Sequence, residues 1–74
     1  MSRPRTYWTV GTRDFRTLIA HEFMSADCAE RYRTRQGLED WVLVNVSVAM
    51  NGNRVYYSPE QPKGPVVTPA AGTF

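Results

Sequence analysis

This chain has little of what most catalytic and metal sites are built from. It holds one cysteine, Cys28, and one histidine, His21, among 74 residues. A single cysteine excludes an internal disulfide, and one cysteine with one histidine cannot supply the four ligands of a structural zinc site. A domain of this size buries only about 60% of its unfolded surface. We therefore expect a partner or a second copy to add to its stability.

Long apolar runs and lysine are also scarce. No stretch approaches the roughly 20 apolar residues that span a bilayer, and the basic start of the chain is not followed by the apolar segment of a signal peptide. We expect a cytoplasmic protein without membrane association, because a lone thiol stays reduced there. The net charge is +2, and every basic residue except Lys63 is arginine. Arginine makes planar contacts with carboxylates and phosphates.

The clearest structural signal is a β-hairpin over Trp41–Ser58. Alternate positions from 42 to 50 hold valine or methionine, which predicts a strand with one buried face, the valine face. Asn51-Gly52 follows it and is the preferred pair for a two-residue type I′ turn. An aromatic return strand comes next.

The two-residue turn predicts a register for this hairpin. Val48 would lie opposite Val55, so that apolar residues meet on the valine face. Arg54, Tyr56 and Trp41 would then lie on the opposite face. That face would hold more arginine and aromatic character than an idle surface needs.

The rest of the body predicts two further strands and one helix. Thr6–Val10 and Phe15–Phe23 are the strands, and a short loop makes them antiparallel. Ser25 is the expected N-cap of a helix over Ala26–Gln36, and Gly37 is its expected C-terminal stop. The fold class is therefore α+β in the order β-β-α-β-β, a four-stranded antiparallel sheet with the helix across the valine face.

The end of the chain differs in composition from the body. Residues 59–74 hold four prolines and two glycines and little charge. We interpret residues 1–58 as a single domain and residues 59–74 as a Pro/Gly-rich tail. The tail would be docked through Val66, Val67 and Phe74 on the body, on a second copy or on a partner.

The candidate chemical groups do not form a catalytic arrangement. His21 and Glu22 are adjacent, so on a strand they point to opposite faces. Cys28 lies on the predicted apolar stripe of the helix, where cysteine acts as a small apolar residue. The carboxylates are dispersed, and no phosphate-binding glycine loop occurs. We expect a protein that is not an enzyme and holds no cofactor and no metal.

Arginine and aromatic residues are the predicted binding groups, because they dominate the energetics of protein interfaces. The predicted partner-binding residues are Arg31, Arg35, Trp41, Arg54 and Tyr56. An alternative is a nucleic-acid binder in which arginines meet phosphates and sheet aromatics stack on bases. The helix arginines Arg31, Arg33 and Arg35 would contact phosphates together with Arg3, Arg5 and Arg54. The aromatic residues that would stack on bases are Tyr7, Trp8 and Tyr56. A further alternative is a homo-oligomeric phage structural component, at its simplest a homodimer.

The order of elements also resembles a known class. Two short strands lead into a helix that begins Ser25-Ala26-Asp27-Cys28-Ala29, and a long strand, Asn51-Gly52 and an aromatic strand follow. In architecture and size, residues 6–58 resemble small phage-encoded inhibitors of the anti-CRISPR type. The resemblance implies an inhibitor that binds a protein or ribonucleoprotein defence complex in the cytoplasm of a bacterial host. It would block target-DNA binding or nuclease recruitment, and the mild positive charge favours binding a protein groove over imitating DNA.

Overall fold

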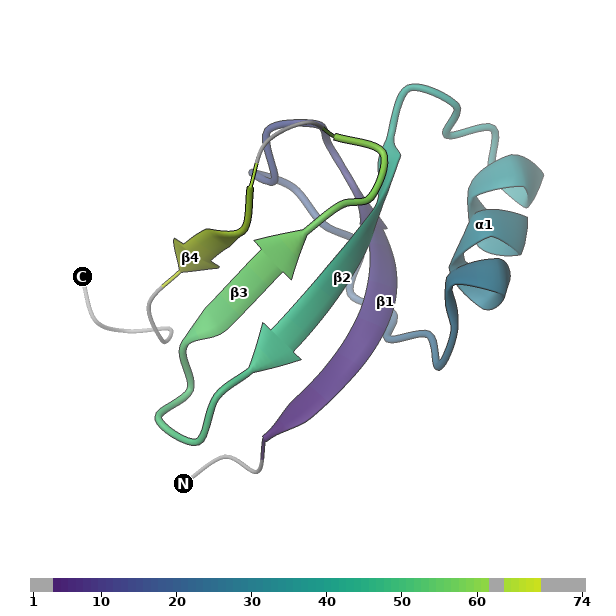
Figure 1. Cartoon of the computed structure of the whole chain (residues 1–74). Helices are drawn as coiled ribbons and strands as arrows, with labels where there is room; N and C mark the ends of the chain where they lie inside the picture. The colour runs from purple at the N-terminus through teal and green to yellow at the C-terminus, as the bar shows by residue number, and fades with distance from the viewer. Residues whose placement is uncertain (1–3, 62–63, 69–74) are drawn as a thin grey trace.

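The computed structural model describes residues 4–61 and 64–68 and contains one helix and one antiparallel sheet (Figure 1). The strands follow one another across the sheet in chain order, with the helix α1 (Ala26–Arg35) after the first of them. They are β1 (Arg5–Gly11), β2 (Val42–Val48), β3 (Arg54–Tyr57) and β4 (Val66–Thr68). The predicted α+β class, with four antiparallel strands and one helix, is confirmed. The order is β-α-β-β-β, because the predicted tail supplies the fourth strand.

The predicted strand Phe15–Phe23 is wrong as a regular strand, although its placement beside β1 is right. The segment pairs with β1 at two isolated bridges, Trp8 with Phe23 and Gly11 with Leu18. Between these bridges β1 has two residues and the segment has four. The two extra residues interrupt the ladder, as in a β-bulge that contains more than one extra residue. The hydroxyl of Thr9 lies 3.1 Å and 3.0 Å from the carbonyl oxygens of residues 19 and 21 and replaces part of the lost pairing.

The hairpin forms, but its predicted register is wrong by one residue. Val48 lies opposite Arg54, and not opposite Val55. The loop has three residues: the Gly52 N–H donates to the Ala49 carbonyl at 2.9 Å, and Gly52 has a left-handed φ of 88°. Among the described residues only Phe15 combines a side chain with positive φ, so residue 51 does not adopt the type I′ conformation. This is the three-residue turn in which glycine takes the left-handed position.

The sheet is packed on both faces. Cross-strand partners share a face, so Arg5 and Arg54 lie beside Val48 on the valine face. The four valines of β2 on this face are at most 7% exposed, and they are covered by Phe15 and Leu18. The valine face is therefore closed at one end by the segment after β1, and the prediction that the helix covers it is wrong.

The helix packs on the opposite face. Ala29 is fully buried against Val10 and Leu43, with Tyr32 and Trp8 at the edge of the cluster. The chain reaches this side because the Trp8–Phe23 bridge holds the residues just before the helix at the free edge of β1. Cys28 is exposed, so the expectation that it packs in the core is wrong.

Both ends of α1 carry the predicted stop signals. The Ser25 hydroxyl accepts a hydrogen bond from the Cys28 N–H at 3.3 Å. At the other end Gly37 has a φ of 68°, and Leu38 N–H donates to the Arg33 carbonyl at 3.0 Å. These two features make a Schellman motif, which satisfies carbonyls that the last turn leaves free.

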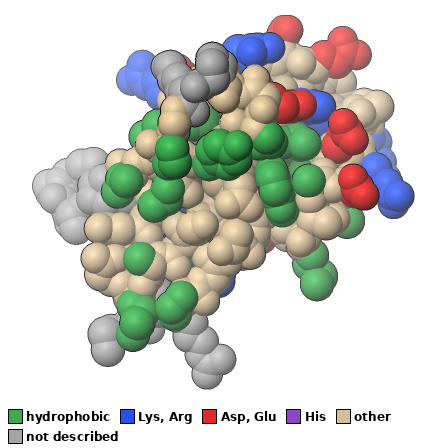
Figure 2. Space-filling model, in the orientation of Figure 1, with side chains coloured by type: hydrophobic (Ala, Val, Ile, Leu, Met, Phe, Trp, Pro, Cys, Tyr) green, Lys and Arg blue, Asp and Glu red, His purple; other side chains and the backbone are tan. Residues whose placement is uncertain are grey.

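Within the described part of the chain, α1 packs on β1 and β2 and not on β3 or β4 (Figure 1). Figure 2 shows charged side chains of both signs gathered over the helix side of the molecule and few over β2 and β3. The exposed apolar side chains of the other half include Tyr57 and Val67.

Phe74, which was predicted to dock with the tail, lies outside the described residues. The predicted domain boundary at residue 58 stays a prediction.

Candidate functional site

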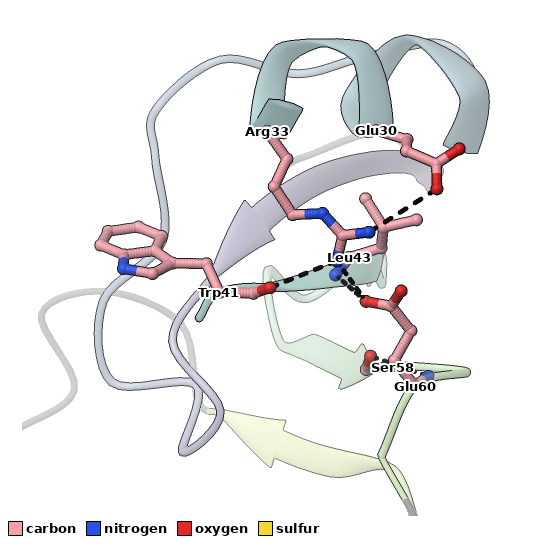
Figure 3. A network of polar contacts seen from close by, with 6 residues as sticks. All are labelled: Glu30, Arg33, Trp41, Leu43, Ser58 and Glu60. Atoms are coloured by element: carbon pink, nitrogen blue, oxygen red, sulfur yellow. Dashed lines mark hydrogen bonds and ion pairs between the residues drawn. The ribbon is translucent and has the colours of Figure 1, made fainter. Parts of the chain in front are cut away.

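Two clefts in the described part of the chain are lined by partly buried arginines, and they differ in how well those arginines are satisfied. The first, of about 340 Å³, lies at the C-terminal end of α1. There the Arg33 guanidinium donates to Glu60 at 2.7 Å and to the Trp41 carbonyl at 3.2 Å, and it lies 3.6 Å from Glu30 (Figure 3). This side chain is 17% exposed and has its partners within the chain. We interpret this cleft as a structural joint.

Glu60 completes this joint by bonding to the backbone of β2 at a position that β3 does not reach. Its carboxylate accepts the Leu43 N–H at 2.9 Å, where the register would bring Pro59 opposite (Figure 3). Burial alone would raise the pKa of Glu60. The Arg33 hydrogen bond, the Leu43 amide and the nearby arginine charges outweigh burial and lower the pKa below its ordinary value of 4.5.

Removing the Glu60 charge is expected to weaken the fold mainly above pH 4.5. Because folding lowers this pKa, the carboxylate stabilises the native state above the ordinary value, and that contribution is lost as pH falls through the folded-state pKa. Glu60→Gln should lower the free energy of unfolding by about 1 kcal/mol at pH 7 and by progressively less below pH 4.5. Urea unfolding at a series of pH values measures this difference. A difference that stays constant down to pH 3 would contradict it. Glu30→Gln, which removes a more exposed carboxylate at a longer distance from the same guanidinium, is the control.

The second cleft, of about 330 Å³, lies on the open end of the valine face. We call it the Arg–Tyr cleft, after Arg5, Tyr7, Arg54 and Tyr56. The register explains the arrangement: both arginines flank Val48, and both tyrosines flank Val46. Two strand spacings separate the members of each pair, roughly 9.5 Å. The outer wall comes from the segment after β1, with residues 18–20 and 22.

The two arginines of this cleft have different partners. Arg5 forms an ion pair with Glu22 at 2.9 Å, and its guanidinium lies 5.4 Å from the centre of the Tyr7 ring. Within residues 4–61 and 64–68, the Arg54 guanidinium makes no hydrogen bond or ion pair, and its Nε is buried without a partner. A buried donor without an acceptor costs free energy. Arg54 therefore lines the cleft with a hydrogen-bonding capacity that the described residues leave unsatisfied.

The tyrosines keep the cleft a donor site. Burial is the largest effect that raises the pKa of Tyr7, and the charge of Glu22 raises it further. The charge of Arg54 partly opposes these two effects. Tyr7 thus remains a neutral phenol, which can donate a hydrogen bond. Phe15 meets the Tyr56 ring edge-on, with the ring centres 6.2 Å apart, and closes the inner end. The arrangement can bind an anion and contains no nucleophile–base pair.

The structure separates the predicted partner-binding residues into three places. Arg31 and Arg35 are exposed, one turn apart, on α1. Trp41 is half-buried beside the first cleft and packs on the helix-side core. Arg54 and Tyr56 are brought together in the Arg–Tyr cleft, on the valine face rather than on the opposite face predicted for them.

Sequence reasoning named Arg5 and Tyr7 only for the nucleic-acid alternative, and it missed Glu22 as a cleft residue. The alternation of β1 was the available signal, since residues 5 and 7 share one face.

Among the described residues, no three His, Cys, Asp or Glu side chains are grouped to hold a metal ion. Nor does that part of the chain include a helix with the length and apolar character to cross a membrane. No family model, no curated protein and no solved structure matches this chain.

Proposed function

We propose that this chain is a protein-binding module without catalytic activity, and that it holds its partner at the Arg–Tyr cleft. The observation that supports the proposal is the Arg54 guanidinium, half-buried in a cleft with two tyrosines and with a buried Nε that has no partner in the described residues. Arginine and tyrosine in a concave site are the residues that contribute most to protein interfaces. Arg33, by contrast, is already paired within the chain.

We further propose that the chain is an inhibitor from a phage or another mobile element. It would bind a defence complex in the cytoplasm of a bacterial host. That step rests on the resemblance of architecture and size alone. The nucleic-acid alternative has weaker support, because Arg5 of the same cleft is paired with Glu22. Tight binding to nucleic acid normally needs several cations along one path.

Affinity purification of the tagged chain from lysate of its source cells, with matched variants, tests the proposal. Arg54→Gln is expected to reduce recovery of a specific protein partner by roughly tenfold or more, the effect of losing one desolvated charged contact. Arg16→Gln removes an exposed arginine outside both clefts and should leave recovery within about twofold. Recovery that is unchanged in Arg54→Gln would contradict the proposal. Loss of all partners after nuclease treatment would favour the nucleic-acid alternative.

A further inference from the structure

The ligand of the Arg–Tyr cleft can be narrowed by its charge. Arg54 carries a full positive charge, and its buried Nε faces no acceptor among the described residues. Arg5 is occupied by Glu22 at 2.9 Å. In the described part of the cleft, Arg54 is therefore the cation that has no anionic partner. One unpaired guanidinium matches one singly charged planar group better than a chain of phosphates.

The geometry of the hydrogen-bond donors in the Arg–Tyr cleft narrows the choice of ligand further. Guanidinium is a planar fork that fits both oxygens of a carboxylate. Tyr7 and Tyr56 line the same cleft, and each phenol can donate to a carboxylate oxygen. Leu18 lines the cleft and packs with Tyr7 and Tyr56 against the buried valines, and an apolar neighbourhood strengthens a charged contact. Glu22 at the rim adds a negative charge, which disfavours a polyanion more than a single carboxylate.

On the basis of the proposed binding function, we infer that the Arg–Tyr cleft binds one carboxylate of a protein partner. The carboxylate is that of an aspartate or glutamate side chain. Arg54 forms the two-pronged contact, and the tyrosines donate from the side. The partner thus presents an acidic residue to this face of the sheet.

A titration followed by NMR tests the inference on the full chain. The probe is N-acetyl-glutamate N-methylamide at constant ionic strength, with the glutamine analogue as the uncharged control. The Arg54 Nε–H resonance is expected to shift and saturate with the glutamate compound in the millimolar range. It should not respond to the glutamine compound. A hexathymidine oligonucleotide tests the nucleic-acid source of an anion in parallel.

Two cleft variants give opposite expected results. Arg54→Lys keeps a charge but loses the fork, so the probe should bind roughly tenfold more weakly. Glu22→Gln removes the rim charge and frees Arg5, so binding should tighten roughly two- to fivefold. A purely structural role for Arg54 would leave the affinity for the probe unchanged in a folded Arg54→Lys variant. Arg16→Lys, at an exposed arginine outside the cleft, is the matched control, and backbone amide spectra show that each variant is folded.

Three results would overturn the inference. They are equal binding of the glutamine compound, tighter binding of the oligonucleotide, and unchanged affinity in Arg54→Lys. The proposed function would survive them if capture of a protein partner still depended on Arg54. Conversely, a titration that behaves as expected, with capture independent of Arg54, would leave the carboxylate site standing and refute its use for the partner.

Discussion

Replacing Phe15 with alanine is expected to lower the free energy of unfolding by about 3 kcal/mol. Phe15 is 7% exposed and packs in one cluster with the four buried valines of β2. A chain of this length is stable by roughly 4–11 kcal/mol in total, so the variant would lose a large part of its stability. Chemical denaturation followed by the fluorescence of Trp8 and Trp41 measures the loss.

The backbone at Phe15 adds a second measurable effect. Its φ of 61° is unfavourable for a residue with a side chain. Phe15→Gly removes that penalty, so it should be about 1 kcal/mol more stable than Phe15→Ala. A Phe15→Ala loss below about 1 kcal/mol would show that Leu18 covers the valines without it. Since Phe15 also contacts Tyr56, the same variant should weaken binding at the Arg–Tyr cleft.

Enlarging Ala29 is expected to be the other strongly destabilising change. Ala29 is fully buried where α1 lies against Val10 and Leu43. Ala29→Leu would push the helix away from the sheet or force strained side chains, at a cost of about 2 kcal/mol. Its measurement is the same denaturation experiment.

A matched control for Ala29→Leu lies one residue earlier on the helix. Cys28 is exposed, so Cys28→Leu should change stability by no more than about 0.5 kcal/mol. Equal losses in the two variants would contradict the packing of α1 on β1 and β2. They would indicate instead that leucine disturbs this helix at any position.

Local signals predicted the elements well where they depend on nearby residues. Ser25 and Gly37 mark the two ends of the helix because their capping hydrogen bonds are made within one turn. The valine alternation of β2 predicted a buried face, and all four valines are buried. The segment 15–23 was harder to predict, because its two extra residues between the bridges depend on how it meets β1.

The candidate site was predicted only in part. Arg54 and Tyr56 were named from residue type and from their place after the turn, and the structure does bring them together. Arg31, Arg35 and Trp41 lie elsewhere. Which residues share a site depends on which distant segments the fold places side by side, and residue type does not reveal that. Glu22 joins the cleft through its ion pair with Arg5, a contact between segments that residue type alone does not reveal.

By itself, the sequence determined that a hairpin forms around Asn51-Gly52, that a capped helix precedes it, and that one face of β2 is buried. Only the tertiary structure decided which residues share that face. The loop closes with three residues, with Gly52 in the left-handed position, and this one-residue shift moves Arg54 and Tyr56 to the other side of the sheet. The physical reason is the two-residue period of a strand, in which a single step of register exchanges the faces. Both turns suit asparagine and glycine, and packing across the sheet selects between them.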